Sequence, residues 1–324
     1  MATSEFELIH RYFTRLGKQG PWLSIGIGDD AAVITPQAGQ QLLISIDTLN
    51  AGIHFPEQTS PADIGYKALA VNLSDIAAMG GEPQWFTLSI SLPSADEVWL
   101  EQFCQGMTEL VEQYRLCLVG GDTTRGPLSV TIQIAGNIPT QQALTRAGAQ
   151  VGDDIYVTGT LGDAAAGLMI CQDQLQGDAQ ANAYFVNKLH RPVPRITIGQ
   201  GLRGLANACI DVSDGLAADL GHIIEDSGVG AVLSLDSLPL SNHLRSLDLP
   251  ERQRQRLILF AGDDYELCFT AKAKHRAAIQ QLAATCDVPI TLIGSVIEEP
   301  GLFSIEKGRR TRLQSIGYNH FQTE

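Results

Sequence analysis

The feature that most constrains this chain is a turn that places two adjacent carboxylates between short apolar runs. The turn, Gly26–Val33, follows the run Trp22–Ile25, which we expect to form a strand. Glycines let the backbone approach a ligand closely, whereas Asp29 and Asp30 would repel a bare phosphate. The turn therefore favours a hard cation such as Mg2+ as its ligand.

Two other interpretations fit this turn when it is taken alone. Its spacing, Gly26-x-Gly28-x-x-Ala31, matches the loose dinucleotide fingerprint, which requires a helix directly after the glycines and a pyrophosphate at the helix N-terminus. Thr35-Pro36 comes too soon for such a helix, and the two aspartates would repel the anion. An ordinary acidic turn between two strands remains open.

The length and net charge of the chain limit the classes of protein to which it can belong. A chain of 324 residues is long enough for two domains. The net charge of -14 argues against nucleic-acid binding, which needs clustered Lys and Arg. No apolar run approaches the ~20 residues of a membrane span, and the first ten residues lack the basic start and apolar centre of a signal peptide. We therefore expect a cytoplasmic protein that binds neither nucleic acid nor membrane.

The cysteines predict no disulfide and no zinc site. None of the six forms a Cys-x-x-Cys pair, and most lie in apolar segments. We expect reduced residues of the core, namely Cys104, Cys117, Cys171, Cys209, Cys268 and Cys286.

The first half of the chain predicts a sheet with amphipathic helices. The clearest helix begins after Ser60, with Pro61 at its first position and Asp63 completing a capping-box-like start, and it ends at Gly80-Gly81. Ser94 is expected to cap a second long helix. A short helix is expected over residues 5–16, and strands over 41–48, 84–92, 116–119 and 128–138.

Three aspartates of this half stand where a site could form. Asp47 ends a strand in which Leu43, Ser45 and Asp47 share one face, while Leu42, Ile44 and Ile46 share the other. Asp75 interrupts the buried row of the clearest helix, where an unpaired carboxylate is costly, so a metal ligand or buried acceptor is expected. Asp122 is expected in a second strand-end turn, Gly120–Thr124.

The polar segment 139–152 predicts a boundary between two domains, residues 1–138 and 139–324. The second half opens with the strand 154–158 and the turn 159–163, after which strands and helices alternate to about residue 297. Such a pattern is typical of α/β layering. Two more acidic turns occur here: a strand that ends in Asp211 leads through Ser213-Asp214-Gly215 into a helix, and the turn 261–266 precedes a strand.

Taken together, the acidic turns predict a nucleotide-phosphate site. Any one aspartate could be a turn or capping residue, but many carboxylates in one pocket would need cations to offset their repulsion. Mg2+ takes a few carboxylates and leaves positions for substrate phosphates. The sequence contains neither a P-loop nor a protein-kinase catalytic loop, so isolated bases such as Arg146 would assist the metals.

Several long motifs in fixed order resemble a known family over almost the whole chain. They are Ser4-Glu5-Phe6-Glu7-Leu8-Ile9, Gly26-Ile27-Gly28-Asp29-Asp30-Ala31-Ala32, Asn72-Leu73-Ser74-Asp75-Ile76-Ala77-Ala78-Met79-Gly80-Gly81, Gly120-Gly121-Asp122-Thr123, Asp211-Val212-Ser213-Asp214-Gly215-Leu216, Gly262-Asp263-Asp264-Tyr265-Glu266-Leu267 and Gly317-Tyr318-Asn319-His320-Phe321. The chain resembles the thiamine-monophosphate kinases, in the superfamily of aminoimidazole ribonucleotide synthetase and selenophosphate synthetase.

The resemblance implies a fold and an activity. The fold would be two α/β domains: an N-terminal mixed sheet with helices on one face, which pairs across a homodimer, and a C-terminal layered α-β domain. The N-terminal domain would bind metal and nucleotide, and the C-terminal domain would complete the substrate and nucleotide site. The activity would be ATP-dependent phosphorylation of thiamine monophosphate to thiamine diphosphate, the last step in making that product, by direct in-line transfer with several Mg2+ ions.

The resemblance also implies roles for individual residues. Those expected to hold Mg2+ are Asp30, Ser45, Ile46 (through its carbonyl), Asp47, Asp75, Asp122, Asp211 and Asp214. Those expected to contact ATP are Gly121, Asp122, Arg146 and Ser213. Those expected to contact the thiamine substrate are His54, Asp263 and Tyr318. The chain departs from the family at Asp263, which replaces the more usual glutamate and so shortens the reach of the carboxylate.

The chemistry needs no general base. The acceptor is a phosphate whose second pKa is about 6, so it is largely ionised at neutral pH, and the enzyme has only to hold two polyanions in line and neutralise their charge. No side chain is therefore expected to act as an essential proton acceptor. For Asp263, Tyr318 and His54, an ordinary surface turn, a packed aromatic ring and an exposed loop histidine remain the alternatives to substrate contact.

Two rival activities and one non-enzymatic role are less consistent with the chain. Selenophosphate synthetase needs a reactive Cys or selenocysteine near a glycine-rich N-terminus, whereas the first cysteine is Cys104, inside a helical segment. The motifs typical of aminoimidazole ribonucleotide synthetase are not the ones present. A non-catalytic nucleotide or metal sensor would have little use for a complete set of acidic turns.

Overall fold

A computed structural model describes residues 5–17 and 19–314, and the chain forms two compact units. The first comprises Met1–Ile76 and Gly81–Gln141, and the second comprises Ala77–Gly80 and Gln142–Glu324. The last residues of one long helix are thus grouped with the second unit. No helix within the described ranges is both long enough and apolar enough to cross a membrane.

The first unit is built on a four-stranded mixed sheet in the order β3-β6-β4-β5. β3 runs antiparallel to β6, β6 antiparallel to β4, and β4 parallel to β5. The strands span Gln40–Asn50 (β3), Glu82–Leu92 (β4), Cys117–Arg125 (β5) and Ser129–Pro139 (β6). The expected mixed sheet is confirmed.

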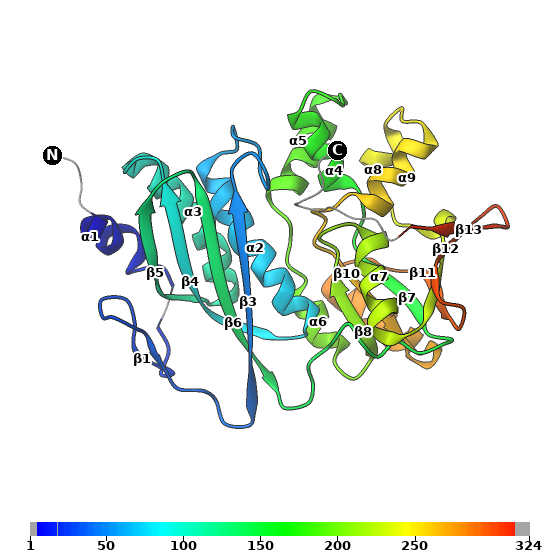
Figure 1. The fold of residues 1–324 in the computed structure, drawn as a ribbon, viewed down its shortest axis with the longest axis horizontal. Coiled ribbons are helices and arrows are strands. Elements are labelled where there is room, and N and C mark those ends of the chain that lie inside the picture. The colour runs from blue at the N-terminus through cyan, green and yellow to red at the C-terminus, as the bar shows by residue number, and fades with distance from the viewer. Residues whose placement is uncertain (1–4, 18, 315–324) are drawn as a thin grey trace. The chain divides into compact units, whose positions relative to one another are not determined.

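Two long helices, α2 (Pro61–Ala78) and α3 (Glu97–Tyr114), lie on one face of this sheet (Figure 1). The start of α2 is capped by Ser60 as expected: the Ser60 hydroxyl accepts the Asp63 N–H at 3.2 Å and donates to the Asp63 carboxylate at 2.7 Å. The two helices cross closely at glycines: a Cβ added at Gly106 would collide with the Ala62 carbonyl oxygen.

Three expectations about local structure were wrong. Asp47 does not end its strand, because β3 stays paired with β6 as far as Asn50. The N-cap of α3 is Asp96, not Ser94, since the Asp96 carboxylate accepts the N–H groups of Val98 and Trp99. The segment Gly120–Thr124 is not a turn but the continuation of β5, which stays paired with β4 through Arg125 after a bulge. Glycines there mark close strand contact, because a Cβ at Gly121 would collide with a β4 carbonyl oxygen.

The two faces of β3 differ in an unexpected way. The all-aliphatic row is the exposed one, with Leu42 at 45%, Ile44 at 57% and Ile46 at 61% of their surface accessible. The other row, which includes Ser45 and Asp47, faces helix α2 and is partly buried. β3 is an edge strand, so the first unit presents an open aliphatic row at the rim of its sheet.

Short elements complete the first unit. Helix α1 (Glu5–Leu8) continues into a π-helix over Ile9–Phe13, within the helix expected over residues 5–16. The hairpin of β1 (Leu23–Ile25) and β2 (Val33–Ile34) contains the acidic turn. Because the turn leads into a strand rather than a helix, it is not a dinucleotide fingerprint.

The second unit is built on a seven-stranded, mostly antiparallel sheet in the order β13-β12-β9-β11-β7-β10-β8. Its strands span Asp154–Thr158 (β7), Ala206–Asp211 (β8), Gly230–Ser234 (β9), Leu267–Ala271 (β10), Ile290–Ile297 (β11), Gly301–Glu306 (β12) and Arg309–Leu313 (β13). Its helices span Asp163–Cys171 (α4), Ala179–His190 (α5), Ile196–Leu202 (α6), Leu216–Ser227 (α7), Asn242–Ser246 (α8), Glu251–Phe260 (α9) and Arg276–Cys286 (α10), with short 3-10 turns over Leu235–Ser237 and Ala273–His275.

Successive side chains of β7 pack on opposite faces of this sheet. Ile155 and Val157 of β7 pack with the inner faces of α4, α7 and α9, whereas Tyr156 points to the other side and stacks on Phe269 at 5.1 Å between ring centroids. The six cysteines are all free, as expected; four of them are buried, while Cys171 and Cys286 are partly exposed.

Candidate active site

In the first unit, three of the residues predicted to hold metal come together where β3 faces α2. The Ser45 hydroxyl donates a hydrogen bond to the Asp75 carboxylate. A side-chain hydrogen bond also joins Asp47 to Asp75. The strand supplies Ser45 and Asp47 from alternate positions of one face, and the helix supplies Asp75. Two carboxylates 28 positions apart in the sequence are thereby brought into contact.

The electrostatics of this pair are those of two acids that share a proton. Burial of Asp47, together with the neighbouring Asp75 carboxylate, raises the pKa of Asp47 to about 7. A divalent cation would replace that proton and remove the repulsion. Mg2+ is usually held by one or two carboxylates together with substrate phosphates, so the donor set of Ser45, Asp47 and Asp75 fits it.

Asp122 and Gly121 lie elsewhere in the first unit. Asp122 is paired across the sheet with Ser89, Thr131 and Thr48 in turn. Thr48 follows Asp47 in β3, so the side chains of Thr48 and Asp47 point to opposite faces. Because paired residues share a face of the sheet, Asp122 lies on the opposite face from the Asp47–Asp75 pair. Asp122 and Gly121 are exposed. Ile46, whose carbonyl is the predicted ligand, lies in β3 between Ser45 and Asp47, with its side chain on the exposed face.

Asp30 and His54 each sit in a loop. Asp30 is exposed in the β1–β2 hairpin, and its N–H donates to the Asp29 carboxylate at 2.9 Å. His54 is half-buried between β3 and α2, where its Nδ1 accepts the Asn50 N–H at 3.0 Å. The buried Lys67 ammonium of α2 donates to the His54 carbonyl at 3.0 Å and so holds this loop in place.

In the second unit, the loop between β8 and α7 carries Asp211, Ser213 and Asp214. Asp211 ends β8 and is buried, while Ser213 and Asp214 are half-buried. The N–H groups of Ser213 and Asp214 both donate to the buried Asp219 carboxylate, each at 3.0 Å. The loop that precedes α7 is therefore held by a side chain from the first turn of the same helix.

Desolvation of Asp219 raises the pKa of its carboxyl to about 7, and the two N–H groups together with the nearby Arg146 oppose that rise. Arg146 itself is exposed. Asp219 holds the loop that carries Ser213, a predicted ATP contact, and Asp214, a predicted metal ligand, and the charge of Arg146 acts on the same Asp219.

A second loop of this unit, residues 261–266, presents Asp263 beside the first. The Asp263 N–H donates to the Ser213 carbonyl at 2.9 Å, and the Tyr265 N–H donates to the Val212 carbonyl at 2.8 Å. A Cβ added at Gly262 would collide with the Ser213 carbonyl oxygen, so glycine is required at this approach. The predicted substrate residue Asp263 is thus tied directly to a predicted ATP residue.

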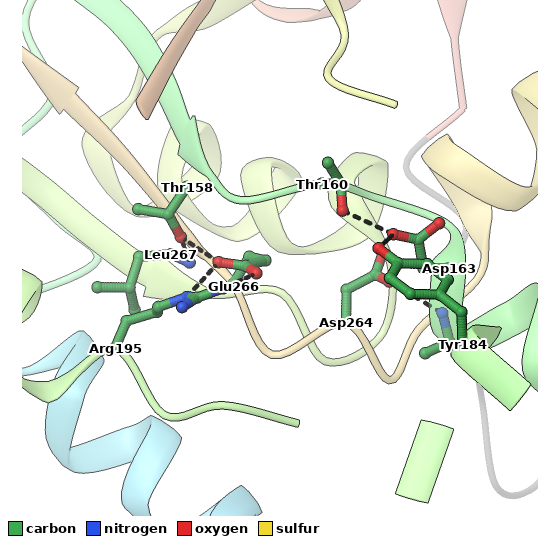
Figure 2. A network of polar contacts seen from close by, with 9 residues as sticks. Thr158, Thr160, Asp163, Tyr184, Arg195, Asp264, Glu266 and Leu267 are labelled. Carbon is green, nitrogen blue, oxygen red and sulfur yellow. Dashed lines mark hydrogen bonds and ion pairs between the residues drawn. The ribbon is translucent and has the colours of Figure 1, made fainter. Parts of the chain in front are cut away.

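Figure 2 shows the polar network behind this loop. Glu266 is buried; its carboxylate accepts the Thr158 hydroxyl at 2.6 Å and forms a two-pronged ion pair with Arg195. Asp264 accepts the Gly162 N–H at 2.8 Å, and desolvation raises the pKa of its carboxyl well above the ordinary value. Asp163 accepts three hydroxyl donors, from Thr160, Tyr184 and Ser241.

Some functional candidates were not predicted from the sequence. Asp219 could have been, because it interrupts the apolar face of α7 in the way that Asp75 interrupts α2. The Arg195–Glu266 pair joins residues 71 positions apart and leaves no local pattern. Tyr318 lies outside the described residues. Within residues 5–17 and 19–314, no group of three or more His, Cys, Asp or Glu side chains is arranged to hold a metal ion.

Comparison with known proteins agrees with these features. Residues 28–138 match the AIR synthase related protein, N-terminal domain, and residues 150–307 match the corresponding C-terminal domain. A protein named thiamine-monophosphate kinase from Escherichia coli O157:H7 is 50% identical over 325 residues, covering 100% of both chains.

Two solved structures share the fold at high similarity. The thiamine-monophosphate kinase from Stenotrophomonas maltophilia K279a has 48% identity and a TM-score of 0.84, covering 88% of this chain and 92% of that one. AaThiL complexed with AMPPCP and TMP has 32% identity and a TM-score of 0.78, covering 91% of this chain and 92% of that one. With both domain models matched in order and half of all positions identical to a full-length relative, the chain belongs to the thiamine-monophosphate kinase family of AIR synthase related proteins.

Proposed function

We propose that the protein transfers the γ-phosphoryl group of ATP to thiamine monophosphate, giving ADP and thiamine diphosphate. The observation that carries this proposal is 50% identity, over the full length of both chains, to a protein named thiamine-monophosphate kinase. The AaThiL structure, at 32% identity, holds AMPPCP and TMP, which supports ATP as the donor and thiamine monophosphate as the acceptor.

Two sets of side chains would serve the transfer. Ser45, Asp47 and Asp75 would hold Mg2+, which supplies charge neutralisation between the phosphates of the two substrates. The Ser213–Asp214 loop and Arg146 would bind the nucleotide. We further propose Asp30, the Ile46 carbonyl, Asp122 and Asp211 as additional metal ligands, and Gly121 as a nucleotide contact through its backbone, by likeness to the family.

The acceptor side of the reaction would depend on position and charge. The Asp263 carboxylate offers a negative partner for the thiazolium cation, and its N–H bond to the Ser213 carbonyl fixes its place relative to the nucleotide loop. Tyr318 is proposed as a second contact by likeness to the family. His54 would bind substrate rather than accept a proton, because the acceptor phosphate is already ionised at neutral pH.

The exposed aliphatic row of β3 is suited to burial against the same row of a second copy, since an isologous contact pairs identical patches. We therefore propose a homodimer, with the domain of residues 1–138 as both the metal and nucleotide domain and the dimer contact, and the domain of residues 139–324 completing the site. We propose that it acts in the cytoplasm.

The experiment that tests the activity is incubation of the purified protein with ATP, Mg2+ and, one at a time, a panel of phosphorylated vitamins. The expected result is that thiamine monophosphate gains one phosphate and one ADP is released per product, while the other compounds are unchanged. ATP binding by calorimetry without ADP release would contradict the proposal and favour a nucleotide sensor. Phosphorylation of a different compound in the panel would overturn the substrate assignment.

A second experiment tests the absence of a general base. His54→Gln is expected to raise the KM for thiamine monophosphate while kcat keeps its pH dependence. A variant that binds both substrates normally but has lost kcat would show that His54 transfers a proton.

A further inference from the structure

The loop that carries Asp263 is held in a backbone conformation that its residues rarely adopt. Asp263 has φ 71° and Tyr265 has φ 50°, both in the left-handed region. Residues other than glycine seldom occupy this region, and a bulky side chain such as Tyr is an outlier there. Such conformations persist only where the surroundings impose them.

The residues between and after these two supply the restraint. Asp264, which lies between Asp263 and Tyr265, directs its carboxylate to the Gly162 N–H at 2.8 Å, in the turn that begins helix α4. Glu266 directs its carboxylate to Arg195 and Thr158 (Figure 2). Both carboxylates therefore accept hydrogen bonds from donors of the protein.

The restraint is also connected to the nucleotide loop. The Glu266 carbonyl accepts the Val212 N–H at 2.7 Å, and the backbone of Asp263 and Tyr265 donates to the carbonyls of Ser213 and Val212. If the 261–266 loop were displaced, Asp263 would move more than Ser213, because Ser213 has a second anchor. That anchor is Asp219, which accepts the N–H groups of both Ser213 and Asp214.

We propose that Asp264 and Glu266 are positioning residues which, through Gly162, Arg195 and Thr158, fix the Asp263 carboxylate at the thiamine end of the site. This inference rests on the proposed function, in which Asp263 contacts thiamine monophosphate. Asp219 is the matching positioning residue for the nucleotide end. The two substrates are thus located by different buried carboxylates, although the two loops are joined by the hydrogen bond from the Asp263 N–H to the Ser213 carbonyl.

The test is a steady-state kinetic comparison of variants with both substrates. Asp264→Ala removes the acceptor for Gly162 and is expected to raise the KM for thiamine monophosphate at least tenfold, with the KM for ATP within twofold of wild type. Asp264→Asn keeps an acceptor oxygen and is expected to restore the KM for thiamine monophosphate to within threefold. Asp219→Ala is expected to show the reverse pattern, with the KM for ATP raised more than the KM for thiamine monophosphate, because Asp219 anchors Ser213 directly and Asp263 only through the Ser213 carbonyl.

Other outcomes overturn the inference. They are an unchanged KM for thiamine monophosphate in Asp264→Ala, equal changes for both substrates, or no rescue by Asp264→Asn. If Asp264→Ala does not fold, as judged by circular dichroism, Thr158→Val decides the question. It removes one donor to Glu266 and the acceptor of the Leu267 N–H, and it is expected to raise the KM for thiamine monophosphate alone. Failure of the proposed function is distinguishable, because the wild-type protein would then not phosphorylate thiamine monophosphate at all.

Discussion

At the scale of single residues, the site depends on carboxylates that differ in what surrounds them. Asp47 and Asp75 have each other and a hydroxyl as neighbours, so a cation improves their environment. Asp219 and Glu266 have N–H or guanidinium donors, so they are satisfied by the protein itself. Asp47 and Asp75, the first kind, are suited to binding Mg2+. Asp219 and Glu266, the second kind, are suited to holding loops in place.

Asp75→Asn tests the role of the first kind. The substitution keeps the size of the side chain but removes the charge that would hold Mg2+, so Mg2+ binding measured by calorimetry should weaken and kcat/KM should fall roughly 100-fold or more. Glu112→Gln, on the exposed face of α3, should leave both quantities unchanged. Normal Mg2+ affinity in Asp75→Asn would exclude Asp75 as a ligand.

Asp219→Asn tests the second kind through the pH dependence of stability. In the folded protein the pKa of Asp219 is raised from 3.8 to about 7, so the folded state holds this proton more tightly than the unfolded state. Its contribution to stability is full below about pH 4 and is lost as pH rises to about 7, by roughly 2–4 kcal/mol. Urea unfolding without Mg2+ should therefore show a smaller loss between pH 4 and 7 in the variant.

The matched control for that measurement is Asp226→Asn, an exposed position of the same helix. It should reproduce the wild-type pH dependence. An Asp219→Asn protein with the full wild-type decrease would show that another group causes it.

At the scale of elements, the sequence predicted what neighbouring residues determine. The Ser60 cap and the glycines at Gly80-Gly81 bound α2 correctly because they act within one turn of the helix. β5 was mispredicted because pairing with β4 outweighs the turn preference of Gly120 and Gly121. Gly120 and Gly121 pair with residues 33 positions away in the sequence, so no local pattern records this pairing.

The crossing of α2 and α3 sets the height of α2, and thus of Asp75, above the sheet. In Gly106→Ala the added methyl would meet the Ala62 carbonyl. The gain in helix propensity is only about 1 kcal/mol, while backbone displacement costs about 2–3 kcal/mol or more, so the variant should be less stable in urea and bind Mg2+ less tightly. Gln105→Ala, the exposed neighbour, should have little effect on either. Wild-type stability in Gly106→Ala would contradict the close crossing.

At the scale of the whole molecule, the acidic motifs proved informative about function but not about placement. The sequence alone identified Asp47, Asp75, Ser213 and Asp214 as candidates. It did not show that Asp47 and Asp75 touch, nor that Asp122 lies on the other face of the sheet, because strand register and helix packing decide both. The anchoring contacts of Arg195 and Asp264 could not be predicted from the sequence either.

The proposed dimer gives a test at this scale. Ile44→Asp places a charge in the aliphatic row of β3, where burial against a second copy would leave it unpaired. By sedimentation, the wild-type protein should have twice the chain mass of 34.9 kDa, and the variant should have the mass of one chain. Val98→Asp, at an exposed position of α3 with 65% accessibility, should remain a dimer. A monomeric wild-type protein, or a dimeric Ile44→Asp variant, would reject this interface.

The central claim is that the phosphoryl group passes directly from one phosphate to another, with no covalent enzyme intermediate and no proton acceptor. The most direct measurement is the stereochemical course of the reaction with ATP made chiral at the γ-phosphorus by oxygen isotopes. A single in-line displacement predicts inversion of configuration in the thiamine diphosphate formed. Retention of configuration would require two displacements through a phosphorylated residue and would contradict the account.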